Sequence, residues 1–380
     1  MNILFLCRQK DLGFGQVSLA RALERRGVCV TCVEDDTEPD EDITKLLARH
    51  TERPSLILQP ELDLPLLPQG LADIDIPTAC LHIDTYAYTE RRIRWSMLFD
   101  HPIVYHPGYR ARFERAGHPG AITFYHAACR DLFDKPPVDR IFDVASVGRT
   151  HNSVQGTRRR VMTALKGRFR LNEWEKWYSY EEMAEVYRHS KIVVNVARDD
   201  FPQDANMRAF EAMAAGCLLI SRVPTELTEI GFQEGVHFVG YQNESEIIGL
   251  ISEYLSQSSD LRRIAEAGRE KVLREHTYDN RASFLLERIE ESAGRFYAPA
   301  RKWPEWRTRT NYIDYYAANR VFECAHTQWR QLATSSPWHA LKGGSVVGRA
   351  WLAEMRRRVG SVKKTQASKV ESDGFRINER

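Results

Sequence analysis

The segment NMRAFEAMAAG at 206–216 carries an arginine and a glutamate at a spacing suited to ligand binding. It is predicted to form a helix that ends at Gly216 and leads into an apolar strand. Arg208 and Glu211 are three residues apart, so their side chains lie on one face of that helix. Arginine offers a planar fork of donors to phosphate oxygens, and an ionised carboxylate accepts two hydrogen bonds from a ribose diol. The pair therefore suits a nucleotide-sugar, and the alternative is an ordinary salt bridge on a solvated helix.

His82 and Asp84 come at the end of the apolar run TACLHID, which is predicted to be a strand. Alternation along the strand turns both side chains to the same side, and we expect them to open into a cleft. A histidine there can hydrogen-bond a sugar hydroxyl, and the aspartate can fix its tautomer or act as a base. The alternative is that the two residues satisfy each other. His106 and His126 end two further predicted strands and are weaker candidates for the same rim.

Cationic residues gather early in the second half of the chain. Gly148 and Arg149 follow a predicted strand at 142–147, and arginines at 158–160 open the next helix. Glycine lets a ligand approach the backbone closely, and cations at this place can neutralise a diphosphate leaving group without a metal. We expect Arg158 or one of its two neighbours to do so and the others to face solvent.

A glycine loop between the first predicted strand and helix supports a second possibility. Gly13 and Gly15 favour backbone approach to a phosphate at the helix N-terminus, and Glu34 follows at about the spacing of a ribose-binding acid. The alternative function is therefore an NAD(P)-dependent oxidoreductase. Against it, the first glycine comes some six residues after the strand, whereas a dinucleotide-binding turn needs it almost directly after.

The sequence offers no recognisable metal site. Asp73 and Asp75 form a D-x-D, but they precede a strand and should lie at its amino end, away from the cleft. No histidine and cysteine cluster has metal-ligand spacing. We therefore expect no metal cofactor.

Strand-like and helix-like segments alternate along most of the chain, which predicts an α/β fold of two doubly wound, Rossmann-like domains facing across a cleft. The Lys-Pro-Pro linker at 135–137 separates them, because proline is excluded from the interior of helices and sheets. The predicted domains are residues 1–138 and 139–295. A helical extension with a disordered end follows at 296–380.

The extension at 296–380 is rich in aromatic and basic residues. Its aromatic residues include Trp303, Trp306, Tyr312, Tyr315, Tyr316, Trp329, Trp338 and Trp351, and its basic end holds Arg356 to Arg358, Lys363 and Lys364. Helices of this composition can dock on anionic lipid headgroups. The alternative is that they pack back on the two domains.

The composition favours a soluble cytoplasmic protein. The net charge of +2 gives no strong field, which argues against a nucleic-acid binder. Seven dispersed cysteines indicate a reducing compartment. No apolar run reaches the length of a spanning helix, and peripheral contact with the inner membrane face stays open.

Four segments of the second half resemble the GT-B glycosyltransferases, specifically the group 1 branch that includes family 4 and the CgeB-like proteins. They are DVASVGRT at 143–150, YRHSKIVVNV at 187–196, NMRAFEAMAAGCLLIS at 206–221 and ELTEIGFQEGVHFVGYQNESEI at 226–247. The resemblance implies a glycosyltransferase that moves a sugar from a nucleoside-diphosphate sugar without a metal, with retention of the anomeric configuration. The acceptor can be a glycan, a lipid-linked glycan, a protein or a small molecule.

The resemblance also assigns roles to residues. Glu211 would hold the donor ribose, Arg149 would contact the diphosphate, and His82 would contact the donor sugar. The predicted catalytic residues are His82, Asp84 and Arg149. The predicted donor-binding residues are Gly13, Gly15, Gly148, Arg158, Asp204, Asn206, Arg208 and Glu211. The sequence departs from family 4 at Gln203, where a second glutamate is usual, and near Gln155, where a basic residue is usual, so that Arg158 must supply that charge.

Overall fold

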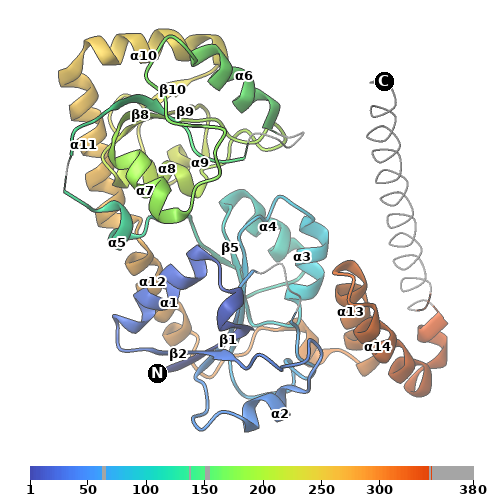
Figure 1. Ribbon diagram of the computed structural model, residues 1–380. Helices are drawn as coiled ribbons and strands as arrows, with labels where there is room; N and C mark the ends of the chain where they lie inside the picture. The colour runs from blue at the N-terminus through green and yellow to red at the C-terminus, as the bar shows by residue number, and fades with distance from the viewer. Residues whose placement is uncertain (62–65, 137, 150–154, 342–343, 345–380) are drawn as a thin grey trace, which may run out of the picture.

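The computed structural model describes residues 1–61, 66–136, 138–149, 155–341 and 344. These residues form two α/β units, drawn one above the other in Figure 1, with a helical hairpin beside the first unit. Each unit holds one parallel sheet with helices packed on it. The predicted fold class is confirmed, since both sheets are parallel and doubly wound.

The first sheet is built from the amino-terminal part of the chain. Its strands are β1 (Asn2–Arg8), β2 (Cys29–Val33), β3 (Leu56–Gln59), β4 (Thr78–His82), β5 (His101–Val104) and β6 (Ile122–Thr123). They pair in the order β2-β1-β3-β4-β5-β6, and every pair is parallel. The strand order changes direction at β1, which places the expected ligand crevice at the carboxyl ends of the strands beside it.

Strand β1 is buried on both faces, as a central strand of a parallel sheet must be. Ile3 and Phe5 enter one hydrophobic core, whereas Leu4 and Leu6 enter another on the opposite face. Successive side chains of a strand point to opposite faces, so an unbroken apolar run supplies both cores. The helices of this unit are α1 (Phe14–Glu24), α2 (Ile43–Ala48), α3 (Thr89–Ser96) and α4 (Pro107–Arg115).

The second sheet has four parallel strands in the order β10-β9-β8-β7. They are β7 (Phe142–Ala145), β8 (Ser190–Asn195), β9 (Leu218–Arg222) and β10 (Val239–Tyr241). The helices around it are α6 (Gly156–Leu165), α7 (Tyr180–Arg188), α8 (Met207–Ala214), α9 (Glu226–Glu229), α10 (Ile247–Ser256) and α11 (Ser258–Glu275), and the short α5 (Arg130–Phe133) precedes the sheet.

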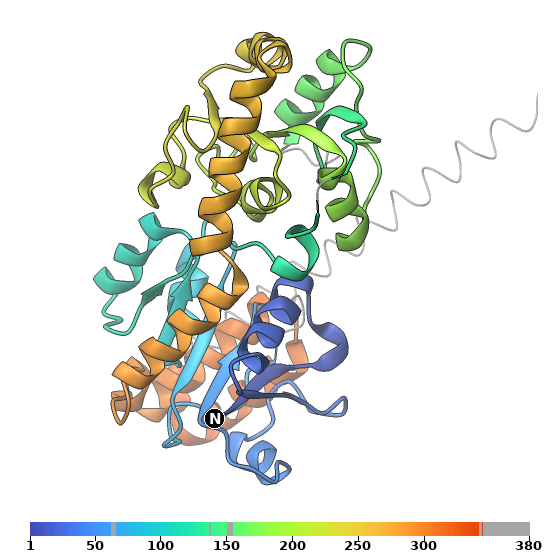
Figure 2. The ribbon, with the colours of Figure 1, turned by 90° about the vertical axis from the view of Figure 1, so that its left-hand side faces the viewer.

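Helix α12 (Tyr278–Glu291) returns from the second unit to the first, where it lies along α1 (Figure 2). Arg25 of the α1 C-terminus donates two hydrogen bonds, of 2.8 and 3.0 Å, to the carboxylate of Asp279. Arg281 donates from α12 to the carbonyl oxygens of Tyr125 and His126. The C-terminal part of the predicted second domain, residues 139–295, therefore packs on the first unit.

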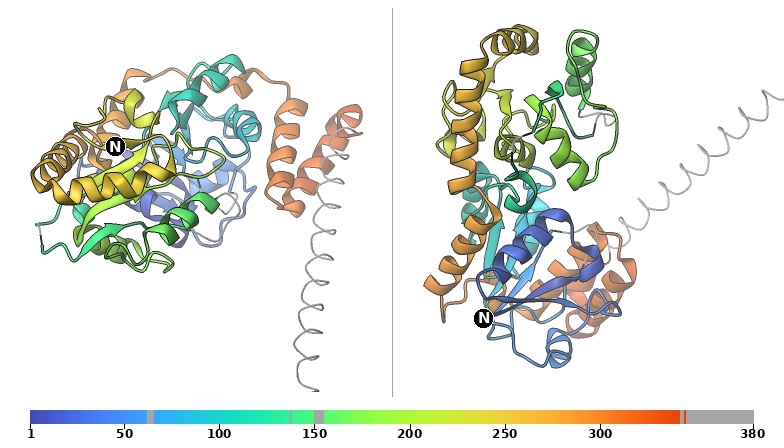
Figure 3. Two further views of the ribbon diagram at one scale, coloured as in Figure 1. Left: turned by 90° about the horizontal axis from the view of Figure 1, so that it is seen from above. Right: turned by 60° about the vertical axis from the view of Figure 1, so that its left-hand side comes forward.

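The hairpin of α13 (Glu305–Ala318) and α14 (Phe322–Ser335) packs on the first unit, next to α3 (Figures 1 and 3). Tyr312, Tyr315 and Tyr316 are buried in the core that contains Leu4 and Leu6. These aromatic residues of the extension are thus core residues. Its basic end, Arg356 to Arg358 with Lys363 and Lys364, lies outside the described residues, as does Trp351. No helix in the described part of the chain is long and apolar enough to cross a membrane.

Candidate functional site

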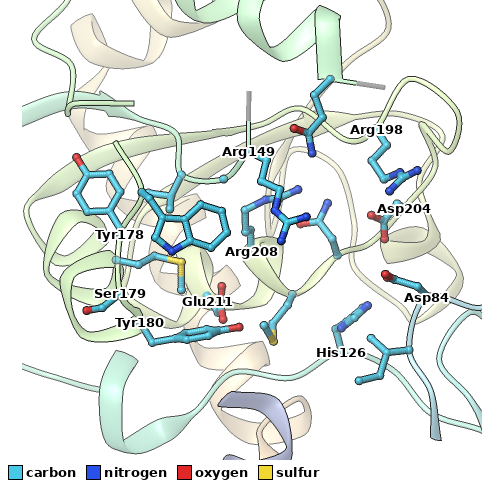
Figure 4. A pocket seen from close by; sticks show the side chains of 18 of the residues that line it. Asp84, His126, Arg149, Tyr178, Ser179, Tyr180, Arg198, Asp204, Arg208 and Glu211 are labelled. Carbon is cyan, nitrogen blue, oxygen red and sulfur yellow. The ribbon is translucent and has the colours of Figure 1, made fainter. Parts of the chain in front are cut away.

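A cavity of about 380 Å³ lies between the two units and is lined by residues of both. Ile83, Asp84, Tyr86 and His126 reach it from the first unit, and the remaining lining residues come from the second. Figure 4 shows the side chains converging on the cavity. It lies beyond the carboxyl ends of β4, β7 and β8, the edge at which parallel sheets bind ligands, although β4 is two strands away from β1, where the order of the first sheet changes direction.

Helix α8 places Glu211 in the wall of this cavity. The helix begins after Asn206 and is followed by Gly216, whose φ of +76° closes the turn into β9. Glu211 is only 1% exposed, and neither of its carboxylate oxygens has a hydrogen-bond partner among the described residues. Burial raises the pKa of Glu211 to about 8, although the nearby Arg208 acts in the opposite direction. A buried carboxyl group without partners is costly unless a ligand supplies them.

Arg208 lies one turn before Glu211 and lines the same cavity. Its guanidinium packs against the backbone of Gly148, where a Cβ atom would be 2.9 Å from Nη1 of Arg208 and 2.9 Å from Nη1 of Arg158. The φ of Gly148 is +134°, a conformation that other residues rarely adopt. Two cations therefore meet the turn after β7 because this residue has no side chain.

Arg158 is hydrogen-bonded to the backbone at this turn and does not line the cavity. It is 1% exposed, and its guanidinium donates to the carbonyl oxygens of Val196, at 2.6 and 3.0 Å, and Arg149, at 2.7 Å. Burial, followed by repulsion from Arg208, lowers the pKa of Arg158 to about 9. The prediction that Arg158 contacts the donor is wrong for this geometry, because all of its donors face the backbone. Its neighbours at 159 and 160 are exposed, as expected.

One end of the cavity is aromatic. Trp177, Tyr178 and Tyr180 line it, and Trp177 is 70% exposed. The guanidinium of Arg149 lies over the Trp177 ring, 5.3 Å from its centroid. Tyr180 stacks on Phe14 of the first unit with ring centroids 3.6 Å apart. A flat, open aromatic face beside cations suits a planar heterocycle.

The other end of the cavity is acidic and contains Asp84, His126 and Asp204 (Figure 4). Asp204 is 7% exposed, its Oδ1 atom has no partner among the described residues, and burial raises its pKa to about 6. Both polar side-chain atoms of the neighbouring Asn206 are also buried without a partner. The predicted residues Asp84, Asp204 and Asn206 thus all reach the cavity.

His82 does not open into the cavity, contrary to the prediction. It is fully buried, and its Nε2 atom lies 2.7 Å from the hydroxyl of Ser96. Its ring packs between Trp95 and Phe113. Strand β4 ends at His82 and the chain then turns, so the alternation that should have aligned His82 with Asp84 stops between them. Its burial lowers the pKa of His82 well below the usual value, which makes it a neutral core residue.

The glycine loop also lies outside the cavity lining. Gly13 precedes α1, and Gly15 lies in its first turn, where a Cβ atom would be 2.9 Å from the hydroxyl of Tyr278. Gly15 therefore permits the close packing of α1 on α12. The prediction that Gly13 and Gly15 line the donor pocket is wrong in this structure, and Phe14 is the loop residue that approaches it, through Tyr180. Glu34, which the oxidoreductase alternative needs, pairs with Arg49 at 3.1 Å.

The lining residues Arg198 and Tyr86 were not predicted, and neither was their neighbour Phe201. Arg198 lies over the ring of Tyr86 at 5.0 Å and pairs with Asp200 at 2.7 Å. Phe201 stacks on Tyr86 across the domain boundary with centroids 4.9 Å apart. The only local signal was the position of Arg198 directly after a strand of the second unit, and the contacts themselves depend on how the two units meet.

A sequence model of a protein family described as glycosyl transferase-like matches residues 140–287. No curated protein sequence matches the chain. Among solved structures, sucrose-phosphate synthase from Thermosynechococcus elongatus aligns over 77% of this chain and 98% of its own, with 13% identity and a TM-score of 0.54. HepE from Anabaena, solved with UDP-glucose, aligns over 76% of this chain and 99% of its own, with 14% identity and a TM-score of 0.54.

A glycosyltransferase from Rickettsia africae aligns over 76% of this chain and 98% of its own, with 10% identity and a TM-score of 0.55. These likenesses establish the GT-B fold, and the family match identifies residues 140–287 as a glycosyl transferase-like domain. The recognition of the fold and of this domain from the sequence is confirmed. The CgeB-like branch stays a prediction.

Proposed function

We propose that this protein is a glycosyltransferase that moves a sugar from a nucleoside-diphosphate sugar to an acceptor nucleophile. The observation that carries the proposal is the unpaired, buried carboxyl group of Glu211, which faces a cavity beside Arg208. A ribose diol would give its two oxygens the hydrogen bonds that they lack. The glycosyl transferase-like domain at 140–287 contains this residue and supports the assignment.

The three parts of the cavity match the three parts of such a donor. The aromatic end at Trp177 suits the base, the central cations suit the diphosphate, and the acidic end at Asp204 suits hydroxyl groups of the sugar. The order along the cavity is the order of the groups along a nucleotide-sugar. We therefore assign the base to the side of α7 and the reacting carbon to the side of Asp84 and His126.

When the diphosphate leaves the sugar, negative charge builds up on its oxygens. Hydrogen-bond donors held in fixed positions can stabilise this charge in a partly closed site. Arg149 and Arg208 line the cavity, whereas Arg158 holds the turn that carries Arg149. We propose that these guanidinium groups serve the diphosphate without a metal bound to it. Closure of the two units about the linker would exclude water from the reaction.

We propose retention of the anomeric configuration, following the family 4 resemblance. An inverting enzyme needs a base that takes the proton of the acceptor, and Asp84 at the acidic end is the candidate for that role. The anomeric configuration of the product, read by nuclear magnetic resonance, decides between them. We further propose that the protein is cytoplasmic, because all seven cysteines are free thiols. Contact of the extension with a membrane remains a prediction, and so does the class of acceptor.

Calorimetric titration of the protein with UDP, GDP, ADP and NADH tests the donor class. We expect one nucleoside diphosphate to bind, with UDP as the first probe because HepE was solved with UDP-glucose. The matching nucleotide-sugars are then incubated with the protein, and release of the diphosphate is followed by chromatography. Binding of NADH without binding of any nucleoside diphosphate would overturn the proposal.

A further inference from the structure

Three metal-ligand side chains converge where the two units meet. His106 follows β5 and His126 follows β6 in the first unit, whereas Asp204 precedes α8 in the second. One ligand atom from each residue lies within 4.8 Å of the other two. Asp204 is about 80 and 100 residues from His126 and His106, which are themselves about 20 residues apart, so the spacing in the sequence is not that of a known metal motif.

The orientation of His106 suits metal binding. Its Nδ1 atom lies 2.8 Å from Oε2 of Glu226, which also accepts a hydrogen bond from the backbone amide of Ala205 at 3.2 Å. With Nδ1 donating its proton to Glu226, the lone pair of the ring is on Nε2. That atom is buried and has no partner among the described residues, and the whole residue is 1% exposed. In metal sites, a carboxylate that accepts a hydrogen bond from one ring nitrogen orients the imidazole so that its other nitrogen can bind the metal.

Asp204 presents a second atom that lacks a partner. Its Oδ1 atom is buried without a hydrogen bond, and the residue is 7% exposed. Asp204 and Glu226 thus place two carboxyl groups around the imidazole of His106. The rings of Tyr86 and Phe201 also pack on this imidazole, with ring centroids 5.5 and 5.0 Å from its own. A bound cation would give Nε2 of His106 and Oδ1 of Asp204 the partner that each lacks, and it would offset the negative charge of the carboxylates.

Two imidazoles and one carboxylate form a ligand set that Zn²⁺ takes readily, with an open fourth position. Bonds of about 2.0 to 2.1 Å hold tetrahedral ligands roughly 3.4 Å apart. The ligand atoms lie within 4.8 Å of one another, so ion binding would draw them together by up to about 1.4 Å. His126 and Asp204 line the donor cavity, and the open position would therefore face its acidic end.

We propose that His106, His126 and Asp204 bind one divalent transition-metal ion, with Zn²⁺ as the reference ion, at the seam between the two units. Two ligands belong to the first unit and one to the second, so the ion would fasten the units to each other beside the reacting end of the cavity. Arg208 lines the same cavity and repels positive charge at His126, so the carboxylates of Asp204 and Glu226 would have to offset its charge when an ion binds. The geometry of this site does not depend on the donor assignment, although His126 and Asp204 also face the sugar end of the cavity.

Tag-free protein is dialysed against a chelator and titrated with ZnCl₂ by calorimetry, and its metal content is measured after gel filtration. We expect one Zn²⁺ per chain. The variants His106→Gln, His126→Gln and Asp204→Asn should each bind at least about 30-fold more weakly, and Glu226→Gln about 10-fold more weakly. Circular dichroism confirms that each variant is folded.

Two controls separate this site from adventitious binding. Cys29 is an exposed thiol, and His189 is a partly exposed imidazole that pairs with Glu185 of α7. Cys29→Ser and His189→Gln should therefore bind Zn²⁺ as the wild type does. Substitution with Co²⁺ should give a visible spectrum without thiolate charge-transfer bands. Absence of stoichiometric binding, or binding that survives in all three ligand variants, would overturn the proposal. No nucleotide is used, so failure of the donor assignment would not affect the result.

Discussion

Arg208 and Glu211 lie one helical turn apart on α8 and line the same cavity, yet neither oxygen of Glu211 has a hydrogen-bond partner among the described residues. The spacing alone was also compatible with a surface salt bridge. The structure excludes that reading, because Glu211 is buried and Arg208 packs on the backbone of Gly148. The carboxyl group of Glu211 is thus available to hydrogen-bond a ligand.

Removing the carboxylate of Glu211 should weaken nucleotide binding. We expect Glu211→Ala to reduce the binding free energy of the preferred nucleoside diphosphate by about 1 to 3 kcal/mol, the scale of leaving a buried hydrogen-bonding group without its partner. Calorimetry on the variant measures this directly. Glu287 is exposed on α12, away from the cavity, and Glu287→Ala is the matched control. Equal affinities of the two variants would show that Glu211 does not touch the nucleotide.

The same carboxyl group predicts a pH dependence of stability. Burial raises the pKa of Glu211 to about 8 from a usual value of 4.5, so between these values the folded protein holds a proton that the unfolded chain has released. The contribution of Glu211 to the free energy of unfolding is therefore full below about pH 4.5 and is lost as the pH rises to 8. The slope is at most about 1.4 kcal/mol per pH unit.

Glu211→Gln removes this titration. Urea unfolding of the wild type and the variant, measured from about pH 5 to 9, should show the variant gaining stability relative to the wild type up to pH 8 and then staying level. A difference that does not change with pH would mean that Glu211 ionises normally in the folded protein.

The helical site was predictable from the sequence because its geometry is local. A spacing of three residues fixes Arg208 and Glu211 on one face whatever surrounds the helix. The strand-end prediction depended on where the strand stops, which period-two alternation does not reveal. Asp84 reached the cavity because the chain turns after β4, and the same turn left His82 in the core between Trp95 and Phe113.

Contacts between the two units could not be predicted in the same way. His106 and Glu226 are 120 residues apart, and their 2.8 Å contact depends on the relative placement of two separately folded sheets. The stacking of Tyr86 on Phe201 has the same origin. No local periodicity encodes such pairs, whereas the apolar runs that built each sheet were visible in the sequence.

Gly148→Ala should damage the diphosphate region. The added Cβ atom would lie 2.9 Å from the guanidinium groups of Arg158 and Arg208, and the backbone would keep a φ of +134°. We expect at least a tenfold loss of nucleotide affinity together with about 1 to 3 kcal/mol of stability. Gly117 is a control for the backbone effect alone, because its φ is +95° and its Cβ position is open. If Gly117→Ala weakened nucleotide binding equally, the loss would come from global destabilisation.

Trp177 provides a test of the base subsite. Its ring is 70% exposed beside the cavity, and a base stacked on it would cover it. We expect Trp177→Ala to weaken nucleotide binding by about 1 to 3 kcal/mol and Trp177→Phe to restore part of it, because stacking needs only an aromatic face. Tryptophan fluorescence should also change on titration with the nucleotide. Trp338 is equally exposed, at 71%, in the extension, and Trp338→Ala should bind normally.

The extension is held to the first unit by a buried charge, which predicts the largest effect on stability. Asp100 is fully buried, accepts hydrogen bonds from the backbone amides of Tyr297 at 2.8 Å and Ala298 at 3.0 Å, and pairs with Arg301 at 3.2 Å. Asp100→Asn leaves the guanidinium of Arg301, which is 18% exposed, without its counter-charge. We expect a loss of about 3 to 5 kcal/mol in the free energy of unfolding, measured in urea. The pair of the half-buried Arg309 and the exposed Glu305 is the control, since Glu305→Gln removes a charge at the surface and should cost less than about 1 kcal/mol. Limited proteolysis should then cut Asp100→Asn after residue 295 faster than the wild type, whereas equal cleavage and equal stability would mean that Asp100 does not anchor the extension.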